Sequence, residues 1–176
     1  MSTDWKNLKV IHYPDPRLRG RCKPVTEFNA DLAGLAERMT ELMHEHKGVG
    51  LAAAQVGVPL RIFVANPTDD RKNDRVYVNP ELFDLEGAKE AEEGCLSIPD
   101  VHIIVRRPLR ARIKAQDVTG AAFERAAEDF EARVWQHETD HLNGVLIIDK
   151  MGPSDRIASK KKLKELEEEF ESTRRR

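Results

Sequence analysis

The feature that most constrains this chain is WQHETDHLNG at residues 135–144, where His137, Glu138 and His141 form the pattern H-E-x-x-H. Residues four apart on an α-helix lie on one face, so both imidazoles would point to the same place. Glu138 would stand beside them without being a ligand, as a general base. The pattern predicts a metal-binding helix that needs a third ligand; the alternative is a helix with two surface histidines.

Composition excludes several classes of protein. The 176 residues are 40% apolar and 34% charged, and 29 basic residues almost balance 31 acidic ones. We therefore expect a single globular domain over residues 1–176, with no general affinity for DNA. Two distant cysteines, Cys22 and Cys95, argue against a disulfide framework and favour a reducing cytoplasm. Neither a signal peptide nor a membrane-spanning run is visible, so no membrane partner is expected.

The first helix should run from about Ala30 to Lys47, because its apolar residues fall three or four apart. Asn29 or Asp31 would cap its start, and Gly48 would supply the left-handed residue after its end. The histidines of its last turn, His44 and His46, are expected to suit the helix dipole rather than to bind metal.

Alternating and β-branched stretches predict strands, and the breaks between them contain proline, glycine or aspartate. The expected strands cover 61–66 and 75–80 as an antiparallel pair, a weaker segment at 81–92, and a meander at 101–106, 110–116 and 121–127.

Two further helices complete the predicted fold. The metal helix should begin near Phe130 and end at Asn143-Gly144, and a charged helix over 154–176 should begin at a Ser154 cap. The fold class is therefore α+β. Antiparallel or mixed β-sheets would pack around a central metal-binding helix, with an N-terminal amphipathic helix and a C-terminal charged helix.

Two loops contain residues suited to chemistry. In GVGLAAAQVGVP, residues 48–59, glycines bracket small residues and one amide, Gln55, which fits either tight packing or a lip over a ligand. EGCLSIPD, residues 93–100, places Cys95 in an apparently irregular segment, where it is the candidate third ligand.

GVGLAAAQ, EGCLS and QHETDHL together resemble the three signature motifs of peptide deformylases, in the same order, and VIHYPDPRLR near the N-terminus extends the similarity. The resemblance covers about residues 8–150. It implies a cytoplasmic bacterial enzyme that removes the formyl group from the N-terminal formyl-methionine of nascent polypeptides. It also implies one divalent metal ion, Fe²⁺ in the cell, which Zn²⁺, Ni²⁺ or Co²⁺ can replace.

The resemblance also implies roles for individual residues. Cys95, His137 and His141 would hold the metal, and a metal-bound water would attack the formyl carbon. Glu138 would take the proton of that water and deliver it to the departing amine. Gln55 and the amide of Leu96 would stabilise the oxyanion.

Substrate binding and support of the ligands are implied in the same way. The backbones of Val49, Gly50 and Gly94 would pair with the extended peptide as an added strand. Glu93 would orient a metal histidine, with Arg107 as its cationic partner.

Two residues near the expected site have no assigned role. Arg133 stands where an apolar residue would more simply line a methionine pocket, and its charged head is expected to point outward while its stem packs. Some relatives have an arginine where this chain has Asp100-Val-His102, so His102 is expected to be a surface residue.

Two other functions compete with deformylation. An H-E-x-x-H metallopeptidase usually takes its third ligand from farther along the chain, whereas no histidine follows His141 here. A non-catalytic deformylase-like protein would retain the fold and bind the ribosome through its last helix, whose three terminal arginines suit RNA phosphates.

Overall fold

The computed structural model describes residues 5–68 and 70–174, and over these residues it contains three α-helices and seven β-strands. The helices are α1 (Ala30–Glu45), α2 (Asp129–Leu142) and α3 (Pro153–Arg174). The strands are β1 (Gly50–Ala52), β2 (Ile62–Ala65), β3 (Arg75–Glu86), β4 (Lys89–Cys95), β5 (Ile98–Arg107), β6 (Arg110–Gln116) and β7 (Ala122–Glu128). The α+β class is confirmed. No described helix has the length and hydropathy needed to cross a lipid bilayer.

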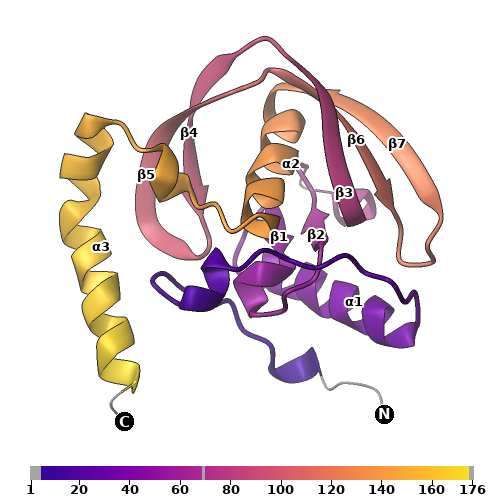
Figure 1. Ribbon diagram of the computed structural model, residues 1–176, viewed down its shortest axis with the longest axis horizontal. Helices are drawn as coiled ribbons and strands as arrows, with labels where there is room; N and C mark the ends of the chain where they lie inside the picture. The colour runs from indigo at the N-terminus through magenta and orange to yellow at the C-terminus, as the bar shows by residue number, and fades with distance from the viewer. Residues whose placement is uncertain (1–4, 69, 175–176) are drawn as a thin grey trace.

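The strands form two separate antiparallel sheets. One has five strands in the order β1-β2-β3-β6-β7, and the other is the two-stranded ribbon of β4 and β5. Figure 1 shows α2 between the ribbon and the larger sheet, with α1 below and α3 beyond β5. The expected pairing of 61–66 with 75–80 is confirmed by β2 and β3. The expected meander from 101 to 127 is wrong, because β5 pairs with β4 and only β6 and β7 continue together.

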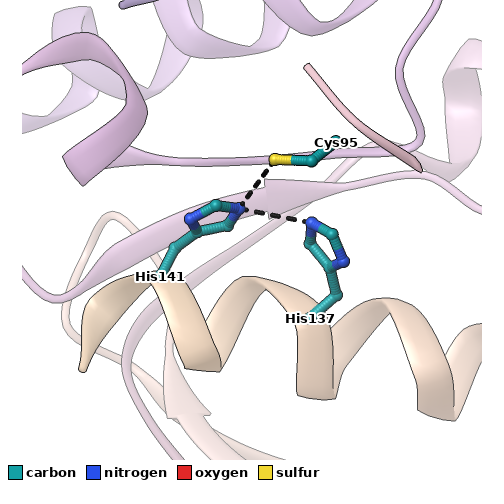
Figure 2. A group of neighbouring side chains, drawn as sticks. All are labelled: Cys95, His137 and His141. Carbon is teal, nitrogen blue, oxygen red and sulfur yellow. Dashed lines mark hydrogen bonds between the residues drawn. The ribbon is translucent and has the colours of Figure 1, made fainter. Parts of the chain in front are cut away.

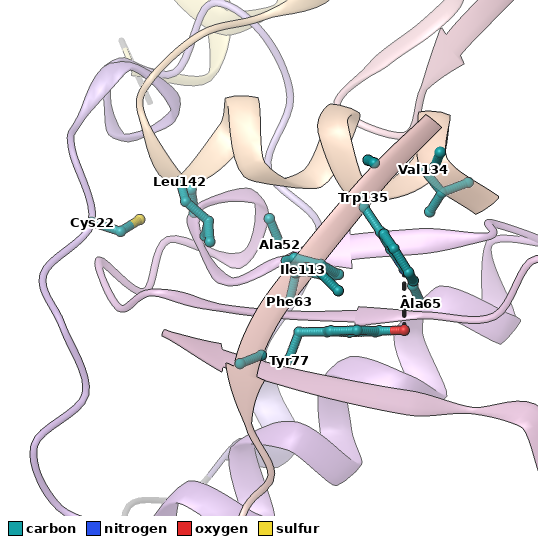
Figure 3. Packing of buried hydrophobic residues seen from close by; sticks show 13 residues of the cluster. Cys22, Ala52, Phe63, Ala65, Tyr77, Ile113, Val134, Trp135 and Leu142 are labelled. Carbon is teal, nitrogen blue, oxygen red and sulfur yellow. Dashed lines mark hydrogen bonds between the residues drawn. The ribbon is translucent and has the colours of Figure 1, made fainter. Parts of the chain in front are cut away.

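α2 is held by an apolar core that it shares with the large sheet. Trp135 is fully buried, and its indole Nε1 donates a hydrogen bond to the Tyr77 hydroxyl at 3.1 Å. Tyr77 in turn stacks on Phe63, with ring centroids 4.6 Å apart (Figure 3). Bulky aromatic side chains contribute most to the burial energy of such a core, so α2 has a firmly fixed position.

A second core lies between the ribbon and α3. Alternate residues of β5, among them Val101, Ile103 and Val105, are buried against Leu166 of α3 and the 3-10 helix Ile147–Lys150. The period of two follows from strand geometry, since every second side chain points to the same face. The predicted apolar stripe of the last helix is therefore narrow, and it packs on β5.

Several predicted boundaries need correction. The left-handed residue after α1 is Lys47, with φ 55°, and not Gly48. Gly48 has another reason to be glycine, because a Cβ there would lie 2.7 Å from Cδ1 of Leu96. The segment at 93–100 is not irregular but forms the end of β4, a tight turn and the start of β5. α3 begins at Pro153, whose fixed φ suits the first turn, so Ser154 lies inside the helix. Arg175 and Arg176 lie outside the described residues.

Candidate metal centre

Three donor side chains converge between the ribbon and α2. Cys95 lies at the end of β4, while His137 and His141 lie one turn apart on α2 (Figure 2). Nε2 of His141 is 3.3 Å from Sγ of Cys95 and 3.2 Å from Nε2 of His137, and donor atoms of all three residues lie within 4.8 Å of one another. The structure thus brings together the three residues that the sequence suggested as ligands.

This arrangement fits a transition-metal ion. Donor atoms bound at about 2.0–2.3 Å around one tetrahedral ion lie roughly 3.3–3.6 Å apart, close to the separations seen here. A thiolate and two imidazoles are ligands that suit both iron and zinc. The group therefore has both the spacing and the donor chemistry for one divalent ion.

Glu93 contacts His137, one of the candidate metal ligands, and fixes its orientation. Its carboxylate accepts hydrogen bonds from Nε and Nη2 of Arg107, at 2.6 and 2.9 Å, and lies 3.0 Å from Nδ1 of His137. Burial alone would raise the pKa of Glu93, but the hydrogen bonds from His137 and Arg107 outweigh it and hold the pKa below its ordinary value. An ionised Glu93 keeps the Nδ1 proton in place, so Nε2 of His137 presents its lone pair to the site.

The charge around the histidines favours an added cation. Burial lowers the pKa of His137, but hydrogen bonds to Cys95 and Glu93 outweigh it and raise the pKa to about 10. Burial and the neighbouring charge of His137 lower the pKa of His141 well below its ordinary value. The pocket thus stabilises one positive charge beside Cys95, which a bound metal ion would supply in place of the proton on Nε2 of His137.

Glu138 faces the same space. It is 3% exposed, and its Oε2 atom has no hydrogen-bond partner among the described residues. Burial raises the pKa of Glu138 to about 7, despite the opposing charges of His137 and Arg107. Gly50 lies against this carboxylate, because a Cβ at that position would collide with it. A carboxylate with a pKa near neutrality can both take up and release a proton.

Gln55 contacts the site through Cys95. Its Oε1 accepts a hydrogen bond from the Ala52 amide at 2.8 Å, which turns Nε2 toward Cys95 Sγ at 3.6 Å and Ser97 Oγ at 3.2 Å. The orientation comes from the 3-10 helix Ala53–Val56, which follows β1 directly. The motif at 48–59 is therefore both a packing loop and a wall of the site.

A cleft of about 590 Å³ opens over these residues. Val49, Gly50, Gly94 and Leu96 line it, together with Cys95, His137 and Glu138. β1 is an edge strand of its sheet, so one row of its backbone groups faces away from β2, and its first residue, Gly50, lines the cleft. All the predicted site residues line this cleft except His141, which contacts Cys95 and His137, and Arg107, which contacts Glu93.

Two expectations about neighbouring side chains have different outcomes. His102 is exposed and lines the rim of the cleft, as a surface residue would. Arg133 does not point outward: it is 6% exposed, and its Nη1 donates to Glu93 Oε1 at 2.7 Å. The buried Glu93 carboxylate attracts the guanidinium inward, a pairing that the linear sequence did not reveal.

The comparisons with known proteins agree with this geometry. The sequence profile of the family described as polypeptide deformylase matches residues 7–157. This chain belongs to the polypeptide deformylase family. A peptide deformylase from Thermotoga maritima is 44% identical over 159 residues, covering 90% of this chain and 95% of that protein. One from Rhodopirellula baltica is 40% identical, covering 94% and 83%.

Solved deformylase structures share the fold. A peptide deformylase from Plasmodium falciparum superposes with a TM-score of 0.90 at 37% identity, covering 94% of this chain and 98% of that one. One from Legionella pneumophila gives 0.86 at 40% identity, covering 96% and 98%. As a deformylase, the protein is a hydrolase, and these similarities do not favour a metallopeptidase of another class.

Proposed function

We propose that this enzyme removes the formyl group from N-terminal formyl-methionine of nascent peptides, using one divalent ion held by Cys95, His137 and His141. The observation that carries the proposal is the convergence of these donors beside the buried carboxylate of Glu138, whose Oε2 atom has no hydrogen-bond partner among the described residues. We expect the ion to be Fe²⁺ in the cell, with Zn²⁺, Ni²⁺ or Co²⁺ as substitutes.

The bound ion would supply Lewis-acid chemistry, acidifying a water molecule and polarising the formyl carbonyl. Glu138 accepts the proton that the water loses on attack and delivers it to the amine as the carbon–nitrogen bond breaks. Its pKa of about 7 suits both halves of this transfer. One side chain therefore serves as base and then as acid.

Charge that develops on the formyl oxygen needs donors already in place. Gln55 Nε2 lies 3.6 Å from the Cys95 sulfur and is held there through the contact of Oε1 with Ala52. We assign Gln55, together with the backbone amide of Leu96, to this oxyanion. Because Gln55 is buried and already held by Ala52, its donor needs no rearrangement before the charge develops.

The substrate peptide would lie along the open edge of β1. Val49 and Gly50 line the cleft on that side and Gly94 on the other, so an extended peptide could pair with backbone on both sides. Backbone pairing does not depend on side chains, which suits an enzyme that acts on many nascent chains. Glu93, paired with Arg107, would hold the imidazole of His137 in the orientation needed to bind the metal.

The test is anaerobic purification, metal analysis and an assay of the same sample on formyl-Met-Ala-Ser. We expect formate release with about one metal ion per chain. Acetyl-Met-Ala-Ser and an internally cleavable peptide serve as matched controls, and both should remain intact. Cleavage of the internal peptide without release of formate would contradict the proposal.

We also propose a cytoplasmic, bacterial location and contact with the ribosome through α3, supported by the bacterial relatives and by the exposed charge of this helix. Lys160, Lys161 and Lys164 are exposed on α3, whereas Leu166 is buried against the rest of the protein. Co-sedimentation with ribosomes at rising salt tests the contact, comparing the wild type with a Lys160→Glu/Lys164→Glu variant. Equal sedimentation of the two proteins would contradict it.

A further inference from the structure

The candidate metal centre spans two separately packed parts of the molecule. α2, which carries His137 and His141, packs against β1, β2, β6 and β7 of the large sheet. The ribbon, which carries Cys95, packs against α3 and the 3-10 helix Ile147–Lys150. The distance between Cys95 and the two histidines therefore depends on the contacts between the ribbon and α2.

Arg133 makes that connection at three points. It lies on α2 one turn before His137, and its guanidinium reaches into the ribbon. Besides the contact with Glu93, Nη1 donates to the carbonyl of Val105 at 2.9 Å and Nη2 donates to the carbonyl of Lys89 at 2.7 Å. One side chain from α2 thus holds both strands of the ribbon, and it holds β4 at two places.

The chemistry of arginine suits this task. Its planar guanidinium presents several donors in fixed directions, whereas lysine offers a single charged nitrogen on a flexible stem. Two ion pairs converge on Glu93, from Arg107 within the ribbon and from Arg133 on α2. Arg107 also reaches Asp140 of α2 at 2.8 Å, so the connection has a second, partly exposed member.

We propose that Arg133 is a positioning residue that clamps the ribbon to α2 and so sets Cys95 against His137 and His141. The proposal rests on the metal site described above. Glu93 is the shared contact: Arg133 holds Oε1 while His137 holds Oε2. Movement of the ribbon would therefore disturb both the thiolate ligand and the orientation of one imidazole.

The clamp is tested by Arg133→Met, which keeps an unbranched stem of similar reach and removes the donors. The Co²⁺-loaded enzyme reports on the ligands, because cobalt–thiolate absorption depends on the sulfur. We expect the ion to be lost to a chelator about 10- to 100-fold faster, as for other losses of support to a ligand. The cobalt–thiolate band should also weaken or shift. Arg106→Met is the matched control, since Arg106 is exposed on β5 of the ribbon, next to Val105.

A double-variant cycle shows whether Arg133 acts through Glu93. In a Glu93→Gln background, the change caused by Arg133→Met should be smaller than in the wild type, because the shared contact is already weakened. Arg133→Lys should recover part of the metal retention, since an ammonium can reach Glu93 but not all three acceptors. Fully additive effects would contradict action through Glu93.

Three outcomes distinguish the clamp from the metal site itself. If Arg133→Met retains cobalt as long as the wild type, with the same absorption, the clamp is wrong and the metal site stands. If the wild type binds no ion, both proposals fail. Circular dichroism shows whether Arg133→Met folds. If it does not, cobalt retention and cobalt–thiolate absorption are measured on Arg133→Lys instead. Retention equal to that of the wild type in Arg133→Lys then overturns the clamp.

Discussion

The two parts that meet at the metal centre are stabilised in different ways. α2 is anchored by aromatic packing in the interior of the protein, where Trp135, Tyr77 and Phe63 are fully buried. The ribbon has an aliphatic core, closed on one side by α3 near the end of the chain. The histidines therefore belong to a firmly packed element, whereas Cys95 depends on a smaller core and on polar contacts. A site shared in this way needs a connection between its halves.

The largest expected effect is a loss of catalytic turnover. The variant that causes it should leave both the α2 core and the ribbon core intact. Glu138→Gln removes the proton acceptor but keeps the shape of the side chain, so turnover should fall by about 10²- to 10⁴-fold while the metal remains bound. Formate release and metal content measure the two effects separately. Glu131→Gln, on the same helix, is the control and should stay active. Near-normal turnover of Glu138→Gln would exclude the proposed base.

The second-largest expected effect is a loss of stability that tests whether aromatic packing anchors α2. Trp135→Ala leaves a cavity in the core that anchors α2 and removes one of the two donors to the Tyr77 hydroxyl, the other being Arg125, so stability should fall by about 3–5 kcal/mol. Urea unfolding followed by circular dichroism measures the loss. Trp5→Ala is a control at a half-buried tryptophan and should cost less. A loss at Trp135 no larger than at Trp5 would show that α2 is not anchored as described.

A smaller effect is expected in the ribbon core. Leu166→Ala weakens the packing of α3 on β5 and should cost about 2 kcal/mol, the lower end for such a truncation, because this core lies near the surface. Amide hydrogen exchange should accelerate in α3 and β5 while α2 stays protected. If amide exchange accelerated equally in α2, the α2 core and the ribbon core would not be stabilised separately.

The smallest effect concerns the outer contact of α3. Tyr13 donates a hydrogen bond to Glu167 at 2.7 Å, and burial together with this bond raises the pKa of Tyr13 to about 12. A raised pKa means that the folded protein holds the phenol proton more tightly than the unfolded chain does. This contribution to stability is complete below about pH 10 and is lost as the pH rises toward 12.

Thermal unfolding between about pH 8 and 11.5 tests that contribution. The melting temperature of Tyr13→Phe should fall less steeply above about pH 10 than that of the wild type, and the two proteins should differ little in slope below it. Identical slopes over the whole range would show that the phenol does not stabilise the docking of α3.

Some features of this protein follow from local sequence. The helix around His137 and His141 was predictable because the four-residue spacing of its histidines and its glycine stop act within a few residues, and it begins at Asp129 and ends at Leu142. The family resemblance likewise rests on short motifs. The comparisons confirm it, and Cys95 does lie beside the two histidines.

Other features depended on contacts between residues distant in the chain. The strand at 98–107 alternates as a strand should, but that pattern does not show which strand it pairs with. In the structure it pairs with β4, and its apolar face is buried against Leu166 and Ile147. Arg133 gives the clearest case. Its charge suggested an outward head, and the position of Glu93, forty residues earlier, brings it inward. A buried carboxylate can pair with a guanidinium only where the fold brings them together, and the local sequence contains no signal for that meeting.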